Sequence, residues 1–198
     1  MHSRRTRSVP SWAAALALGL MAAPRPVTAT PCTGDRAGSG FASFYTYTPG
    51  TGACSFTGDD FGTNVAAINA VDYAGSVMCG AWLSVTGPLG SVNVRIVDMY
   101  PDCPSGDLDL NAAAFAAIAN PADGRAPITW KTIPDPSGSI LFLQLSAGSN
   151  LHFLQIQPRH SRYAVSSLEY LGPSGYVTAP REVYNYFTVD GSLTPVPL

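Results

Sequence analysis

The sequence predicts a mainly β protein built from two small units, and two patterns support this prediction. Apolar residues at 92, 94 and 96 alternate with polar residues at 93 and 95, which is the period of two of a strand with one buried face. After residue 128, short apolar runs recur between Gly and Pro turns, at 128–133, 139–145, 151–157, 163–171, 176–178 and 183–188. That spacing is typical of a small β-sandwich.

The first 29 residues have the pattern of an export signal. Arginines at 4, 5 and 7 precede a short apolar core at 12–23, and small residues at 27–29 supply a cleavage site after Ala29. The core is too short for a stable bilayer anchor, and prolines at 24 and 26 interrupt it. We therefore expect a secreted, extracellular protein, with one domain at 30–122 and a second at 123–198, joined at a polar Pro/Gly stretch.

The net charge expected for the mature chain limits the classes of molecule that it could bind. Cleavage after Ala29 would leave seven basic against thirteen acidic side chains, a net charge of −6. This acidity argues against binding to nucleic acid and to anionic surfaces. Neutral glycans are the expected partner class. We expect no cofactor, no metal and no membrane contact of the mature chain, and a monomer.

All four cysteines follow the predicted signal, and an even number in an exported chain predicts two disulfides. Three pairings are possible. We favour Cys54–Cys79, whose members flank a segment that must fold back on itself, together with Cys32–Cys103, which would tie the start of the mature chain to the turn after Tyr100. Metal binding is disfavoured because the cysteines form no Cys-x-x-Cys pair.

Polar side chains suited to a glycan gather around the strand at 92–100. Asp98 and Tyr100 continue the apolar parity of this strand, so both are expected to point to one side where it ends. After a Pro/Gly turn, Asp109 stands just before Asn111, a good N-cap for a helix over 112–119. Two carboxylates and a phenol near one groove suit a polysaccharide, whose hydroxyls need acceptors and whose glycosidic oxygens need an acid.

The chain resembles the expansin family, especially its microbial members, through motifs that run in the expected order. These motifs are Gly40-Phe-Ala-Ser-Phe-Tyr45, Gly52-Ala-Cys-Ser-Phe56, Val65-Ala-Ala-Ile-Asn-Ala70, Asp72-Tyr73, Cys79-Gly-Ala-Trp-Leu83, Val97-Asp-Met-Tyr-Pro101, Leu108-Asp-Leu110, Ile128-Thr-Trp130 and Tyr184-Asn-Tyr-Phe187. The resemblance implies a six-stranded double-psi β-barrel followed by an immunoglobulin-like, cellulose-binding β-sandwich. The family's second domain usually continues for one or two further strands, so this sandwich is expected to be incomplete.

The same resemblance implies roles for individual residues of the first domain. Asp109 falls at the position of the general acid of related inverting endoglucanases, an Asp that expansins need for wall loosening. Asp98 and Tyr100 match two other polar groups of the expansin groove. Ser43 stands where the family has a threonine, and it keeps the hydrogen-bonding oxygen.

The catalytic base of those endoglucanases has no counterpart in the motif. Tyr47 stands at its position, four residues after Ser43, and the nearest carboxylates, Asp59 and Asp60, fall in a turn that is expected to be a surface loop. Inverting hydrolysis needs a second carboxylate, so we expect wall loosening without hydrolysis. The alternatives are a weak endoglucanase or a peptidoglycan lytic transglycosylase with Asp109 as its acid. A polysaccharide-binding or plant-interaction module without loosening activity is a further alternative.

In the second domain, the resemblance places a row of sugar-stacking side chains at His152, Phe153 and Tyr184. Microbial expansins usually have two adjacent tryptophans and a tyrosine there. The smaller rings in this chain predict weaker binding to cellulose. For Phe153 a place in the core is the alternative, because adjacent strand residues face opposite sides.

Overall fold

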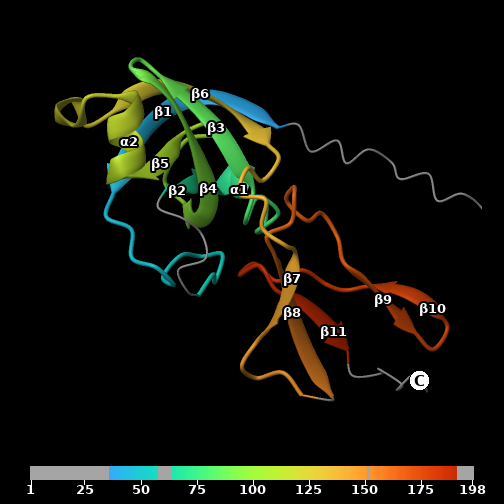
Figure 1. The fold of residues 1–198 in the computed structure, drawn as a ribbon. Helices are drawn as coiled ribbons and strands as arrows, with labels where there is room; N and C mark the ends of the chain where they lie inside the picture. The colour runs from blue at the N-terminus through green and yellow to red at the C-terminus, as the bar shows by residue number, and fades with distance from the viewer. Residues whose placement is uncertain (1–35, 58–63, 151, 191–198) are drawn as a thin grey trace, which may run out of the picture. The chain divides into compact units, whose positions relative to one another are not determined.

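The computed structural model describes residues 36–57, 64–150 and 152–190 (Figure 1). The predicted export signal and its cleavage site lie outside the described residues. The elements, in chain order, are β1 (Ala37–Tyr45), β2 (Val65–Asn69), α1 (Ala70–Tyr73), β3 (Trp82–Gly87), β4 (Gly90–Tyr100), β5 (Leu108–Asn111), α2 (Ala112–Ile118), the 3-10 turn η1 (Pro121–Asp123), β6 (Ala126–Ile133), β7 (Phe142–Leu145), β8 (Phe153–Arg159), β9 (Glu169–Gly172), β10 (Gly175–Thr178) and β11 (Phe187–Asp190).

Six strands close into a barrel in the order β1-β5-β2-β4-β3-β6 (Figure 1). Strand β1 runs parallel to β5, and β2 runs parallel to β4, while the other pairings are antiparallel. Closure pairs every strand of the barrel on both sides and so protects its edges. The mainly β class and the six-stranded barrel that the sequence predicts are confirmed.

The barrel interior follows from the sequence periodicity. In β6, residues 126, 128 and 130 are buried and residues 127, 129 and 131 are exposed, as the period of two requires. All five residues of β2 are buried, and this strand lies between β4 and β5. Helix α2 buries Ala114, Phe115 and Ile118 against the barrel, and the Phe115 ring lies 4.8 Å from that of Phe44.

The strand predicted at 128–133 belongs to the barrel and not to a second domain. As β6 it pairs with β1 on one side and with β3 on the other, and it completes the closed sheet. Alternation identified the strand, but it contains no information on the strand's partners. We therefore propose a domain boundary after Ile133 in place of the one at residue 122.

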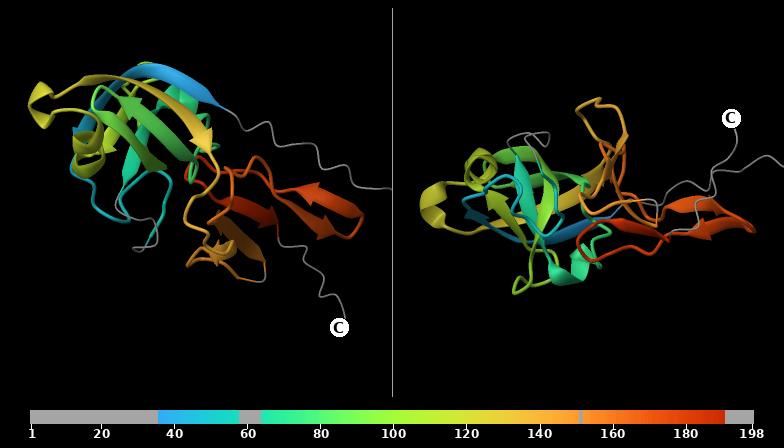
Figure 2. Two further views of the ribbon diagram at one scale, coloured as in Figure 1. Left: turned by 45° about the horizontal axis from the view of Figure 1, so that its top comes forward. Right: turned by 90° about the horizontal axis from the view of Figure 1, so that it is seen from below.

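Two small sheets follow the barrel, with strand orders β11-β8-β7 and β10-β9 (Figure 2). Phe187 and Val189 of β11 form a buried cluster with Ala179, and apolar side chains of β8 and β9 pack against it. Strands of both sheets thus share one small core, as in the predicted sandwich.

Three of the predicted strands in this region are shorter than expected, and the run at 139–145 is a strand only from Phe142. The run at 163–171 is a strand only from Glu169, and the run at 183–188 only from Phe187. Before β11, Asn185 has a φ of 66°, a left-handed conformation that interrupts an extended strand. Aromatic and β-branched composition predicted strands at 163–171 and 183–188, but composition does not report this backbone reversal.

Arg95 is another departure from the simple alternation in β4. The pattern placed it on the exposed face, yet only 1% of its surface is exposed. Its guanidinium lies 5.4 Å from the centre of the Phe56 ring and 6.0 Å from that of Trp82, and its Nη1 is 3.4 Å from His160 Nδ1. Stacking on aromatic rings stabilises a cation away from bulk water.

Candidate functional site

Asp109 and Ser43 are brought together by two parallel strands of the barrel. The β1–β5 register sets Ser43 opposite Asp109, and the Ser43 hydroxyl donates a hydrogen bond of 2.8 Å to Asp109 Oδ1. Asp109 lies on β5, two residues before the helix N-cap Asn111 that the sequence identified. The pairing explains why a serine or threonine is suited to position 43.

The surroundings of the Asp109 carboxyl favour its protonated form. Burial raises its pKa, and the negative charge of Asp98 raises it further, whereas the Ser43 hydrogen bond acts in the opposite direction. The net effect is a pKa above the ordinary aspartate value, so the proton persists to higher pH. A half-buried carboxyl with a raised pKa can donate its proton to a glycosidic or hydroxyl oxygen.

Asp98 is held by the backbone around it. Its Oδ1 accepts hydrogen bonds from the amide of Ala53 at 2.6 Å and from that of Met99 at 2.8 Å. The loop that carries Ala53 comes so close to β4 that a Cβ on Gly52 would lie 2.3 Å from the Val97 carbonyl oxygen. Glycine is therefore required at position 52.

The strand that carries Asp98 is irregular just before it. The register of β4 against β2 shifts between Ile96 and Asp98, which leaves Val97 as the extra residue of a bulge. The period of two that was extended from Ile96 to Asp98 and Tyr100 is thus broken at Val97. Tyr100 lies at the exposed end of β4, and in the described part of the chain no hydrogen bond joins its hydroxyl to Asp98 or Asp109.

Tyr45 is a residue of this site that the sequence reasoning missed. Its hydroxyl is buried and has no hydrogen-bond partner among the described residues. Burial raises its pKa most, and the charges of Asp98 and Asp109 add to the effect, which places the phenol near both carboxylates. Alternation along β1 was the available signal, because Tyr45 has the same parity as Ser43.

Replacing Tyr45 tests whether its unpartnered hydroxyl serves the site. Tyr45→Phe removes a buried polar group whose desolvation is not compensated, so we expect the free energy of unfolding to rise by about 1 kcal/mol. We also expect wall loosening to fall, because a substrate hydroxyl would lose a partner. Denaturant titration and a wall-extension assay on the same preparation measure the two effects, and unchanged loosening would assign the hydroxyl no role.

Tyr47 occupies the position where the related endoglucanases carry their base. It is half-buried, and burial raises the pKa of its phenol, with the charge of Asp98 adding to the rise. Its ring lies 6.2 Å from that of Tyr45. A phenol with a raised pKa stays protonated at neutral pH and so cannot take the proton of a water molecule. Asp59 and Asp60 lie outside the described residues.

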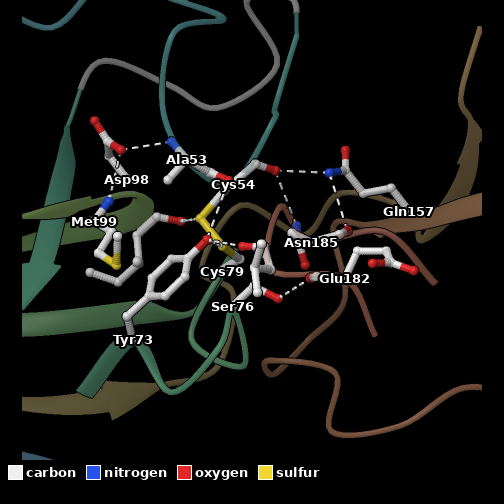
Figure 3. Close-up of a disulfide and its surroundings, with 12 residues drawn as sticks. Ala53, Cys54, Tyr73, Ser76, Cys79, Asp98, Met99, Gln157, Glu182 and Asn185 are labelled. Carbon is white, nitrogen blue, oxygen red and sulfur yellow. Dashed lines mark hydrogen bonds between the residues drawn. A yellow bond between two sulfur atoms is a disulfide. The ribbon is translucent and has the colours of Figure 1, made fainter. Parts of the chain in front are cut away.

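The disulfide predicted between Cys54 and Cys79 is confirmed, with an S–S distance of 1.97 Å and a Cα–Cα distance of 5.5 Å (Figure 3). Cys103 is a half-buried free thiol, and burial together with the charges of Asp107 and Asp109 raises its pKa to about 11. Cys32 lies outside the described residues, so the Cys32–Cys103 bridge stays a prediction.

Two of the predicted stacking residues share one face of the C-terminal sheet. Phe153 is 42% exposed, while Leu154 and Ile156, of the opposite parity on β8, pack against the small core. Tyr184 is 39% exposed, and its hydroxyl accepts a hydrogen bond of 2.7 Å from Gln155, which has the parity of Phe153. The core position considered for Phe153 is therefore wrong.

His152 lies in the turn before β8. Its side chain is exposed, and its backbone amide donates a hydrogen bond of 2.9 Å to Asn150 Oδ1.

Within residues 36–57, 64–150 and 152–190, no three His, Cys, Asp or Glu side chains are grouped in a way that could hold a metal ion. Across these same ranges no helix combines the length and the apolar character that crossing a bilayer requires.

Comparison with known proteins places the chain among relatives. No family model matches it. It is 32% identical over 127 residues to Expansin-YoaJ of Bacillus subtilis (strain 168), an alignment that covers 62% of this chain and 55% of that protein. It is 36% identical over 103 residues to an EG45-like domain containing protein of Arabidopsis thaliana, covering 46% of this chain and 80% of that protein. The chain thus spans about half the length of the Bacillus relative.

Two solved expansin structures are similar in fold to this chain. The expansin of Clavibacter michiganensis superposes with a TM-score of 0.75 at 26% identity, and 82% of each chain is covered. A mutant of that expansin in complex with cellohexaose superposes with a TM-score of 0.72 over the same share of each chain. The ordered motifs, the closed six-stranded barrel and these relatives agree, and the chain is homologous to expansins and expansin-like proteins.

Proposed function

We propose that this chain is an exported expansin-like protein that binds cellulose or a related wall polysaccharide and loosens the wall without hydrolysing it. The observation that supports this most directly is the Ser43–Asp109 pair, in which a half-buried carboxyl with a raised pKa receives a hydroxyl hydrogen bond. Asp98, close enough to influence that pKa, supplies a second acceptor. The Clavibacter relative in complex with cellohexaose supports a glucan as the ligand.

The two proposed activities use different side chains. The carboxylates of the barrel act on the polymer, whereas Phe153 and Tyr184 present apolar ring faces to it. A pyranose ring carries C–H groups on its faces, and these pack on aromatic rings in water. The predicted acidity of the mature chain suits an uncharged polymer, since the contact does not depend on charge attraction.

The absence of hydrolysis is proposed from the segment that follows Ser43. An inverting glycosidase holds a base about 6.5–9.5 Å from its acid, to activate water on the far side of the sugar. Residues 41–50 contain no Asp or Glu, and Tyr47 stands at the base position. Asp98, the other carboxylate of the groove, accepts hydrogen bonds from two backbone amides. An acid with no base at the position of Tyr47 supports hydrogen-bond exchange with the polymer but not inverting hydrolysis.

One paired assay tests this proposal. A single preparation is measured for extension of cellulosic wall material under load and for release of reducing sugars. We expect extension without new reducing ends. New reducing ends that disappear in Asp109→Asn would favour a hydrolase or a lytic transglycosylase, and binding without extension would favour a binding module.

The aromatic face is tested by substitutions that change ring area. Each aromatic contact contributes about 0.5–1.5 kcal/mol beyond area burial, so Tyr184→Ala and Phe153→Ala should each weaken cellulose binding by about twofold to tenfold. His152→Trp should strengthen it, because an indole offers a larger face. Pull-down isotherms measure all three variants.

Tyr176→Ala is the matched control, because Tyr176 is 78% exposed on the β9–β10 hairpin, away from Phe153 and Tyr184 in sequence and sheet. Its isotherm should equal that of the unmodified protein. If none of the aromatic substitutions changes the binding isotherm, cellulose binds to the barrel and not to the aromatic face.

A further inference from the structure

Two side-chain amides of the C-terminal region hold one carbonyl of the barrel. Gln157 Nε2 donates a hydrogen bond of 2.9 Å to the Cys54 carbonyl oxygen, and Asn185 Nδ2 donates one of 3.4 Å to the same oxygen (Figure 3). Gln157 is fully buried and Asn185 is 4% exposed. An unpaired amide at either position would be costly, so these bonds define the packing here.

Both amides are held in orientation by neighbouring arginines. Arg159 Nε donates to Gln157 Oε1 at 2.9 Å, and Arg181 Nη1 donates to Asn185 Oδ1 at 3.1 Å. Since each amide oxygen accepts from a guanidinium, each amide nitrogen is left to point at the Cys54 carbonyl. The two arginines are in turn bound to barrel carbonyls, Arg159 Nη1 to that of Thr57 at 2.8 Å and Arg181 Nη1 to that of Ser76 at 3.2 Å.

The segment that receives these bonds is the one that holds Asp98. The amide of Ala53 donates to Asp98 Oδ1 at 2.6 Å, and the amide of Cys54 donates to the Val97 carbonyl oxygen at 3.2 Å. The Tyr73 hydroxyl lies 3.2 Å from the Ala53 carbonyl oxygen and 2.8 Å from that of Val183. Every polar backbone atom of Ala53 and Cys54 is thus paired (Figure 3).

The other end of this arrangement reaches the aromatic face. Asn185 lies between Tyr184 and Tyr186 in the chain, and its left-handed φ of 66° shapes the turn that presents Tyr184. Gln157 lies two residues after Gln155, whose amide binds the Tyr184 hydroxyl. The aromatic face and Asp98 are therefore connected by these hydrogen bonds together with neighbours along the chain.

We propose that Gln157 and Asn185 are positioning residues for Asp98, and that they couple a sugar bound at the aromatic face to the geometry of the groove. They fix the Cys54 carbonyl, and so hold the segment whose Ala53 amide, two peptide units before that carbonyl, donates to the carboxylate. This inference rests on the proposed function for its ligand, a cello-oligosaccharide, while the positioning itself depends only on the contacts described. Gln157 and Asn185 need not touch the polymer.

Hydrogen exchange at the Ala53 amide tests the positioning directly. Gln157→Met keeps the length of the side chain and removes its donor, and Gln144→Met is the matched control, because Gln144 lies opposite Gln157 in the β7–β8 register. We expect Ala53 exchange to be about tenfold faster in Gln157→Met, the effect of losing about 1.4 kcal/mol of local protection. Amides of β2 and the control variant should be unchanged.

Cellohexaose is the probe for the coupling. In the unmodified protein it should slow Ala53 exchange, and in Gln157→Met it should bind within about twofold of the same affinity without slowing that exchange. Wall loosening per bound molecule should fall in the same variant. Equal Ala53 exchange in the unmodified protein and in Gln157→Met would overturn the positioning role, and equal slowing by cellohexaose in both would overturn the coupling.

Two provisions keep the outcome decisive. Faster amide exchange in β2 would reveal that Gln157→Met does not fold. In that case the same exchange measurements on Asn185→Gly test the positioning role, because glycine keeps the left-handed backbone and removes the side-chain amide. If the unmodified protein does not bind cellohexaose, the proposed function and the coupling are both overturned, while the exchange comparison without sugar still decides the positioning role.

Discussion

Asp109→Asn is expected to abolish wall loosening while binding to cellulose stays within about twofold of the unmodified protein. The amide keeps the shape of the carboxyl and can still accept the Ser43 hydrogen bond, but it can neither release nor take up a proton. The aromatic face is built from other strands and is unaffected. Extension of wall material under load and a binding isotherm measure the two activities.

Asp123→Asn is the matched control, because Asp123 is exposed in η1 and outside the groove. It should leave both activities unchanged. Parallel loss of binding and loosening in a folded Asp109→Asn protein would show that the two activities share one surface.

The same substitution has an expected effect on stability. Since burial and Asp98 raise the folded-state pKa of Asp109, its ionised form is less favourable in the folded protein than in the unfolded chain. Stability linked to this group is fully present below its ordinary pKa of 3.8 and is lost as the pH rises through the raised folded-state value. Asp109→Asn should therefore raise the Tm near neutral pH, and the difference should shrink as the pH falls toward 3.8. A Tm difference between the two proteins that stays constant across this pH range would contradict the raised pKa of Asp109.

Removal of the Cys54–Cys79 disulfide is expected to have the largest effect on stability. The bond closes a loop with a sequence separation of 25 residues, for which the chain-entropy model gives about 3.5 kcal/mol. Cys54 also carries the carbonyl that Gln157 and Asn185 bind. The Cys54→Ala/Cys79→Ala protein should lose this free energy of unfolding in a denaturant titration, and its Ala53 amide should exchange faster.

Cys103→Ala provides the comparison. Cys103 is a free thiol in the structure, so its replacement should change the free energy of unfolding little. A loss as large as that of the double variant would instead support the predicted Cys32–Cys103 bridge.

The sequence by itself determined the local features of this protein. Period-two alternation identified β4 and β6, the spacing of cysteines favoured Cys54–Cys79, and ordered motifs identified Ser43, Asp98 and Asp109 as a group. These are short-range properties: side chains alternate along a strand because of backbone geometry, whatever the strand pairs with. The same parity would have found Tyr45.

Only the tertiary structure decided which segments meet. β6 closes the barrel because a closed sheet needs a sixth strand between β1 and β3, a requirement that no local pattern records. The bulge at Val97 and the left-handed Asn185 break the alternation, and each depends on a partner distant in sequence. The bonds from Gln157 and Asn185 to Cys54 join residues more than a hundred positions apart, and it is the burial of these groups that makes their pairing obligatory.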